Sequence, residues 1–262
     1  MLKRELKINS KTLLIFLFIL VAMLGTVCAV YPSIATSDVD IDAMLKMFPK
    51  SMLEAFNMDV VSIGSVFGWL ATEGYMFITL LGGCYFAILG GTILLKEQSE
   101  HTIDFLYSKP VSKSKILTSK ILCGLIYLII FNVVVGATTF IGLKVNNDFD
   151  FTKWTLITIA PLFLELFFFV VSLLMSIFFK KTSKGISIAI GTVFIMYLFN
   201  LLGTLTDKIE FLKYISIFNY MDSRQIITDN HIEMFGLILT SVVSIITVIM
   251  TYLLYNRKEL GK

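Results

Sequence analysis

The chain has 262 residues, of which 56% are hydrophobic and only 16% are charged. A soluble domain is typically about 45–50% apolar and about 25% charged. Here the apolar excess gathers into runs of about 20 residues or more, long enough to cross a hydrocarbon core of about 30 Å. We therefore predict an all-α integral membrane protein. The net charge of +3 is small and dispersed, which argues against a nucleic-acid partner.

Six apolar runs predict six transmembrane helices within a single domain covering residues 1–262. The expected spans are residues 12–32, 71–95, 117–143, 154–179, 185–205 and 234–255. The basic start imitates a signal peptide, but the first run is longer than a signal-peptide core and five more follow, so we predict a retained span. Residues 1–11 are mildly amphipathic, with Leu2 and Leu6 able to face lipid, and predict a short elbow helix at the membrane surface.

Residues 33–69 form the longest segment that cannot span. Apolar side chains between Ile41 and Phe56 recur at helical spacing, which predicts an amphipathic helix along the membrane face, bent near Pro49. Asp38, Asp40 and Asp42 lack the glycine and glutamate of a calcium-binding loop, so capping or solvated roles are favoured. The three cysteines lie in apolar runs and form no cluster with histidine, so no metal site is predicted.

The distribution of basic residues predicts the orientation. Six spans place the connecting segments alternately on two sides of the membrane. On one side, segments 1–11, 96–120, 180–184 and 256–262 hold 15 of the 22 Lys and Arg residues. On the other side, segments 33–69, 144–153 and 206–233 hold the remaining 7. Because cytoplasmic loops carry the excess of Lys and Arg, the first set is assigned to the cytoplasm. Both termini are then expected in the cytoplasm of a multi-pass plasma-membrane protein, with residues 33–69 outside.

No motif for catalysis is present: there is no GxxxxGK[ST] phosphate loop, no GxSxG and no HExxH. We predict no catalytic residue in this chain. Glu165 stands near the middle of the fourth span, where carboxylates are costly and are functional candidates by default. Two interpretations stay open. Glu165 could line a polar path together with Tyr85, Tyr197 and Asn200, or it could form a structural hydrogen bond with a partner such as Asn132.

Residues 96–120 form a polar island between the second and third spans. Residues 96–107 can form a helix that carries Glu97, Glu100 and Asp104, and Pro110 should end it. Ser112 or Ser114 is expected to cap the helix that follows. A short helix held between two spans can transmit force to a protein that docks on it, although an ordinary loop is the equally weighted alternative.

The island resembles a motif of membrane permeases from type-2 ATP-binding-cassette (ABC) exporters, roughly E…GT…LL…P-[VL]-S-[RK]…K. The matching positions are Glu97, Thr102, Phe105–Leu106, Pro110–Lys113 and Lys120. His101 departs from the pattern, since the family usually has glycine there. The layout of six spans is also similar, as is an outer FP…L…AF…D stretch at Phe48–Pro49, Leu53, Ala55–Phe56 and Asp59.

This resemblance implies partners and roles. Two permease chains, identical or homologous, would associate with two separate ATPase subunits, which would bind ATP and Mg, while this chain would hold no cofactor. The island would be the coupling helix, with docking residues Glu97, Glu100, Thr102, Phe105, Leu106 and Pro110. The expected cargo is an amphipathic peptide, a lipid-like molecule or a hydrophobic drug. The rival hypotheses are an ion-coupled carrier that uses Glu165 and a membrane scaffold or sensor that transports nothing.

Overall fold

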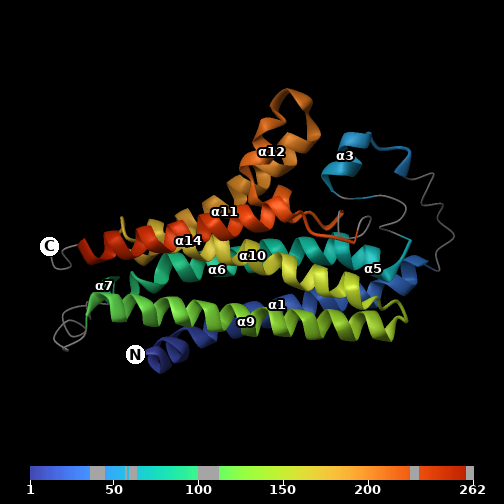
Figure 1. Ribbon diagram of the computed structural model, residues 1–262. Coiled ribbons are helices and arrows are strands. Elements are labelled where there is room, and N and C mark those ends of the chain that lie inside the picture. The colour runs from blue at the N-terminus through green and yellow to red at the C-terminus, as the bar shows by residue number, and fades with distance from the viewer. Residues whose placement is uncertain (36–44, 57, 59–63, 100–111, 225–229, 258–262) are drawn as a thin grey trace.

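The computed structural model describes residues 1–35, 45–56, 58, 64–99, 112–224 and 230–257. Within these ranges the chain is helical and contains no strand. Six helices are long and apolar enough to cross a membrane, which confirms the prediction of an all-α membrane protein. Their long axes run side by side, as Figure 1 shows.

The spanning segments lie close to the predicted ranges. They are α1 (Leu2–Ala35), the continuous run of α5 (Val66–Trp69), the π-helix η1 (Leu70–Gly74) and α6 (Tyr75–Ile93), then α9 (Lys113–Val145), α10 (Phe151–Ser176), α11 (Thr182–Leu205) and α14 (Met234–Arg257). Shorter helices connect them: α3 (Lys50–Ala55), α7 (Lys96–Ser99), the 3₁₀ turn η2 (Asp207–Ile209), α12 (Phe211–Ile215) and the 3₁₀ turn η3 (Ile217–Met221).

The amino-terminal segment differs from the prediction of a separate elbow helix. Residues 2–11 belong to the same uninterrupted helix as the first span, and that helix continues through Pro32 to Ala35. Leu2 and Leu6 pack against the protein core instead of facing away from it. The physical reason lies in buried polar links between this end of α1 and the helices beside it, described below.

The outer segment is described only in part. Pro49 precedes α3, which covers part of the predicted amphipathic helix, whereas residues 36–44, 57 and 59–63, including the three aspartates, lie outside the described residues. The second span begins at Val66, five residues before the predicted start, because Ser65 caps it by accepting a hydrogen bond from Gly68 N at 2.9 Å.

Helix α6 is the most enclosed of the spanning helices, and glycines let its neighbours approach at backbone distance. A β-carbon on Gly90 would lie 2.2 Å from the carbonyl oxygen of Phe169 in α10. A β-carbon on Gly91 would lie 2.8 Å from the carbonyl oxygen of Gly185 in α11. These glycines therefore permit the close helix–helix contact that is usual where membrane helices pack tightly.

The ends of the bundle differ. The start of α1, the end of α14 and α7 lie at one end, whereas α3, α5 and α12 lie toward the other, with α12 standing off the bundle beyond the end of α11 (Figure 1). We call these the α7 end and the α12 end. At the α7 end, the predicted cap Ser112 accepts a hydrogen bond from Lys115 N at 3.4 Å and starts α9.

Candidate functional site

A buried ionic cluster lies at the α7 end and joins the two limits of the 96–120 island. The ammonium of Lys120 is 2.8 and 2.9 Å from the two carboxylate oxygens of Glu97 and 3.3 Å from those of Glu5. It also donates a hydrogen bond to the carbonyl oxygen of Ile93 at 2.6 Å, at the last residue of α6. The three charged residues are each buried, with Lys120 only 2% exposed. One lysine thus connects α1, α6, α7 and α9.

Further polar links hold the first turns of α1 against this cluster. The Asn9 side chain is 2% exposed; its amide donates to the carbonyl of Glu5 at 2.9 Å, and its oxygen accepts from the Lys96 ammonium at 2.5 Å. The Tyr127 hydroxyl of α9 donates to the carbonyl of Leu6. These bonds explain why residues 2–11 continue the bundle rather than lie apart from it.

Glu97, one of the predicted docking residues, lies in this buried cluster. Its carboxylate is turned inward to Lys120, and the residue is 6% exposed in this chain. The remaining predicted docking residues lie outside the described residues; they are Glu100, Thr102, Phe105, Leu106 and Pro110. The docking role of all six residues stays a prediction, and the structure adds that Glu97 ties the start of the island to Lys120 of α9.

Sequence reasoning missed the roles of Glu5 and Lys120. The family motif includes Lys120 only as its last position, and Glu5 falls within the segment predicted to form an elbow helix. One signal was available: Lys120 is followed by the apolar run ILCGLIYLII, so its charge falls where a helix enters the membrane and needs a partner. The identity of that partner, 115 residues earlier in the chain, could not be read from spacing.

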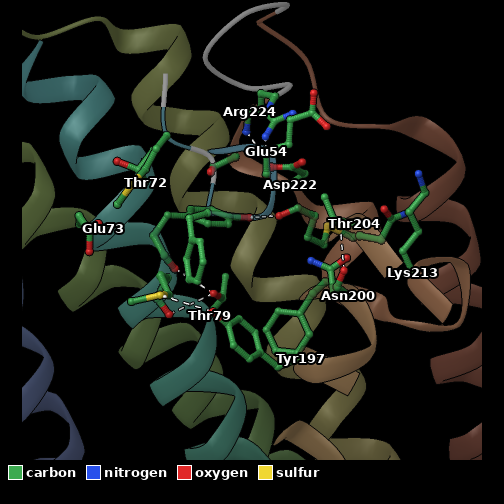
Figure 2. A pocket seen from close by; sticks show the side chains of 18 residues that line it. Glu54, Thr72, Glu73, Thr79, Tyr197, Asn200, Thr204, Lys213, Asp222 and Arg224 are labelled. Atoms are coloured by element: carbon green, nitrogen blue, oxygen red, sulfur yellow. Dashed lines mark hydrogen bonds between the residues drawn. The ribbon is translucent and has the colours of Figure 1, made fainter. Parts of the chain in front are cut away.

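A cavity of about 500 Å³ opens toward the α12 end between η1, α6, α11 and η3. Figure 2 shows Tyr197 and Thr79 at its base and Arg224 and Glu54 near its upper rim. Of the four residues predicted for a substrate path, Tyr197 and Asn200 line this cavity. The wall is closed in part by the Tyr75 hydroxyl, which donates a hydrogen bond to the carbonyl of Met221 at 2.8 Å.

The charges at the rim are largely held by protein partners. The Lys213 ammonium is 2.7 Å from the carboxylate of Glu210, and this hydrogen bond lowers the pKa of Glu210 and raises the pKa of Lys213. The Arg224 guanidinium donates to the carbonyl oxygen of Glu54, at the end of α3, and the Arg224 backbone amide donates to Asp222 at 2.9 Å. These bonds fix α3 and the segment after η3 around the mouth of the cavity.

Tyr85 and Glu165, the other two predicted path residues, lie in the packed core and do not line this cavity. The Tyr85 ring is stacked on Phe131 with centroids 5.8 Å apart and planes at 5°. Glu165 has no exposed surface, and its Oε2 accepts a hydrogen bond from Asn132 Nδ2 at 2.6 Å. Of the two interpretations of Glu165 left open by the sequence, the structural hydrogen bond to Asn132 is the one observed.

The described residues contain no group of three or more His, Cys, Asp or Glu side chains that could hold a metal ion. The full sequence also lacks a nucleotide-binding loop. Six apolar helices, with an ionic cluster at one end and a mixed polar cavity toward the other, define a multi-pass membrane protein.

Comparison with protein families identifies the class more closely. Residues 5–260 match the family model described as "ABC-2 family transporter protein". The match covers nearly the whole chain, so the chain belongs to this family and is the membrane component of an ABC-type transporter. A search of curated proteins finds none that matches it.

Proposed function

We propose that the chain is the export permease of an ATP-driven transporter in the plasma membrane. Two permease chains, identical or homologous, would work with two ATPase subunits that bind ATP and Mg. Family membership supports an ATPase partner. The excess of Lys and Arg on segments 1–11, 96–120, 180–184 and 256–262 supports a cytoplasmic location for the α7 end and for both termini.

One observation carries the proposed coupling: Glu97 and Lys120, near the two limits of the island, are bound to each other in a buried salt bridge. An ATPase that moved the island would therefore exert force directly on the salt bridge between Glu97 and Lys120. The Lys120 ammonium also contacts the Glu5 carboxylate and the Ile93 carbonyl oxygen. The force would therefore be transmitted to α1, α6 and α9 together. Such a cluster suits a rigid-body movement of packed helices.

The cargo in this proposal is an amphipathic or hydrophobic molecule. The spans are rich in aromatic residues, with 23 Phe in the chain. The cavity toward the α12 end combines aromatic and methionine side chains with hydroxyl, amide and charged groups, a mixture suited to a molecule with both apolar and polar parts.

Co-purification with the ATPase encoded by a neighbouring gene tests the docking. The tagged permease should retain the ATPase on size exclusion, and the double variant Phe105→Arg/Leu106→Arg should release it, because two buried cations would be forced into the interface. Phe211→Arg, at an exposed residue of α12, is the matched control and should retain the ATPase. Unchanged retention by the Phe105/Leu106 double variant would refute docking through the island, and transport without any ATPase would favour the carrier hypothesis.

A further inference from the structure

We propose that the cavity toward the α12 end is a binding site for a small amphipathic organic cation that carries N–H groups. This inference rests on the proposed export function and deepens it by naming a substrate class. The cavity lies within one chain and is formed by η1, α6, α11, α3, α12, η3 and the residues that follow α3 and η3 (Figure 2). Four kinds of observation point to a cation.

The first is a set of acceptors that the protein itself does not satisfy. Glu73 lines the cavity, and its carboxylate has no hydrogen bond or ion pair with any described residue. Asn200, which also lines it, buries a side-chain oxygen that lacks a donor in the part of the chain described. Buried or half-buried acceptors normally find donors. An organic cation that carries N–H groups would place its charge near the Glu73 carboxylate and donate to the Asn200 oxygen, which lies on the other side of the cavity (Figure 2).

The second is the aromatic character of the cavity base. Tyr197 and Phe218 both line it and meet edge to face, with ring centroids 5.5 Å apart. Tyr75 supplies a third ring, held by its bond to the Met221 carbonyl. Cations are attracted to the faces of aromatic rings, and such rings also bury the apolar part of a ligand. The volume of about 500 Å³ suits a molecule of drug size.

The third is the balance of charge. The lining contains three carboxylates, Glu54, Glu73 and Asp222, and two basic residues, Lys213 and Arg224. One of the basic residues, Lys213, is already paired with Glu210, which does not line the cavity. The cavity therefore carries an excess of negative charge and would repel an anionic ligand while attracting a cationic one.

The fourth is the backbone around Glu73. This residue sits in η1, a single π-helical stretch between α5 and α6. Such wide turns inside α-helices are rare and occur frequently at functional sites. The turn is supported by packing, since a β-carbon on Gly74 would lie 2.7 Å from Leu70 Cδ1. The π-helix thus interrupts the regular helix at the residue that brings the unpaired carboxylate to the cavity.

The test uses the permease alone, in phosphatidylcholine nanodiscs, without ATPase or nucleotide. Binding of ethidium, a planar organic cation, is measured by fluorescence anisotropy, and 8-anilinonaphthalene-1-sulfonate serves as an anionic probe of similar size. We expect saturable ethidium binding that Glu73→Gln weakens about tenfold or more, because a charge-assisted contact is lost. Tyr197→Leu should weaken it about fivefold, whereas Tyr197→Phe should retain it. Asp207→Asn, an exposed carboxylate outside the cavity, is the control and should bind as the wild type does.

Two results would overturn the proposal: ethidium binding unchanged by Glu73→Gln, or tighter binding of the sulfonate that depends on the same residues. Should Glu73→Gln fail to fold by circular dichroism, Asn200→Leu and the Tyr197 pair decide the question in its place. Since neither ATPase nor nucleotide takes part, failure here leaves the docking result standing, and failure of docking leaves this result standing.

Discussion

The first prediction concerns the stability that the buried ionic cluster of Lys120, Glu97 and Glu5 gives to the fold. Lys120→Met keeps most of the volume of the side chain but removes the ammonium that is 2.8 and 2.9 Å from the Glu97 oxygens and 3.3 Å from those of Glu5. Two buried carboxylates then face each other, and the Ile93 carbonyl loses its 2.6 Å donor. Removal of one partner from a buried ion pair costs about 3–5 kcal/mol. That cost corresponds to a fall of roughly 6–20 °C in the unfolding temperature.

Thermal unfolding of the permease in nanodiscs measures this effect. Adding Glu97→Gln and Glu5→Gln to Lys120→Met should restore part of the lost stability, because the uncompensated charges disappear with the lysine. Lys213→Met is the matched control: it breaks the Lys213–Glu210 pair, whose side chains are 25% and 47% exposed, and solvent screening should leave the unfolding temperature near that of the wild type. An unfolding temperature for Lys120→Met equal to the wild-type value, or further loss on adding the glutamines, would refute the reasoning.

Two further predictions concern the core and use the same unfolding assay. Glu165→Gln should stay within about 1 kcal/mol of the wild type, because it keeps an acceptor for the Asn132 amide and adds a donor. Glu165→Leu should cost about 1–3 kcal/mol by leaving Asn132 without that partner, and a leucine variant more stable than the glutamine variant would contradict this role. Gly185→Ala should cost about 1–3 kcal/mol, because its β-carbon would lie 2.2 Å from the Gly91 carbonyl. A β-carbon on Gly191 would have no atom within 4 Å, so Gly191→Ala should leave stability unchanged or raise it slightly. Equal changes in stability for Gly185→Ala and Gly191→Ala would count against close packing at Gly185.

The helices were predictable because membrane thickness imposes their length and polarity. The residues at which the helices begin and end were harder to predict, because a helix continues past the apolar run wherever a cap or a polar partner supports it. Lys113, Ser114 and Lys115 are polar, yet they belong to α9 because Ser112 caps that helix. The first turns of α1 continue the span for a similar reason, through the buried contacts of Glu5 with Lys120.

The candidate sites were predictable only in part. The bond between Glu165 and Asn132 could be anticipated, because few polar groups lie deep in neighbouring spans and each needs a partner. The division between cavity and core could not, because Tyr85 and Tyr197 look alike in sequence. The orientation of each helix about its own axis decides that Tyr85 stacks on Phe131 while Tyr197 lines the cavity.

Helix α6 connects the two sites described here. Its last residue, Ile93, accepts the hydrogen bond from Lys120, and its first residue, Tyr75, lines the cavity. Nineteen residues of α-helix at about 1.5 Å each make a rod about 28 Å long between them. Because α6 is packed at backbone distance against α10 at Gly90 and against α11 at Gly91, it cannot bend or slide alone without displacing those helices. A load applied at Lys120 is therefore expected to reach the cavity as a joint shift of α6, α10 and α11, and not as a local distortion.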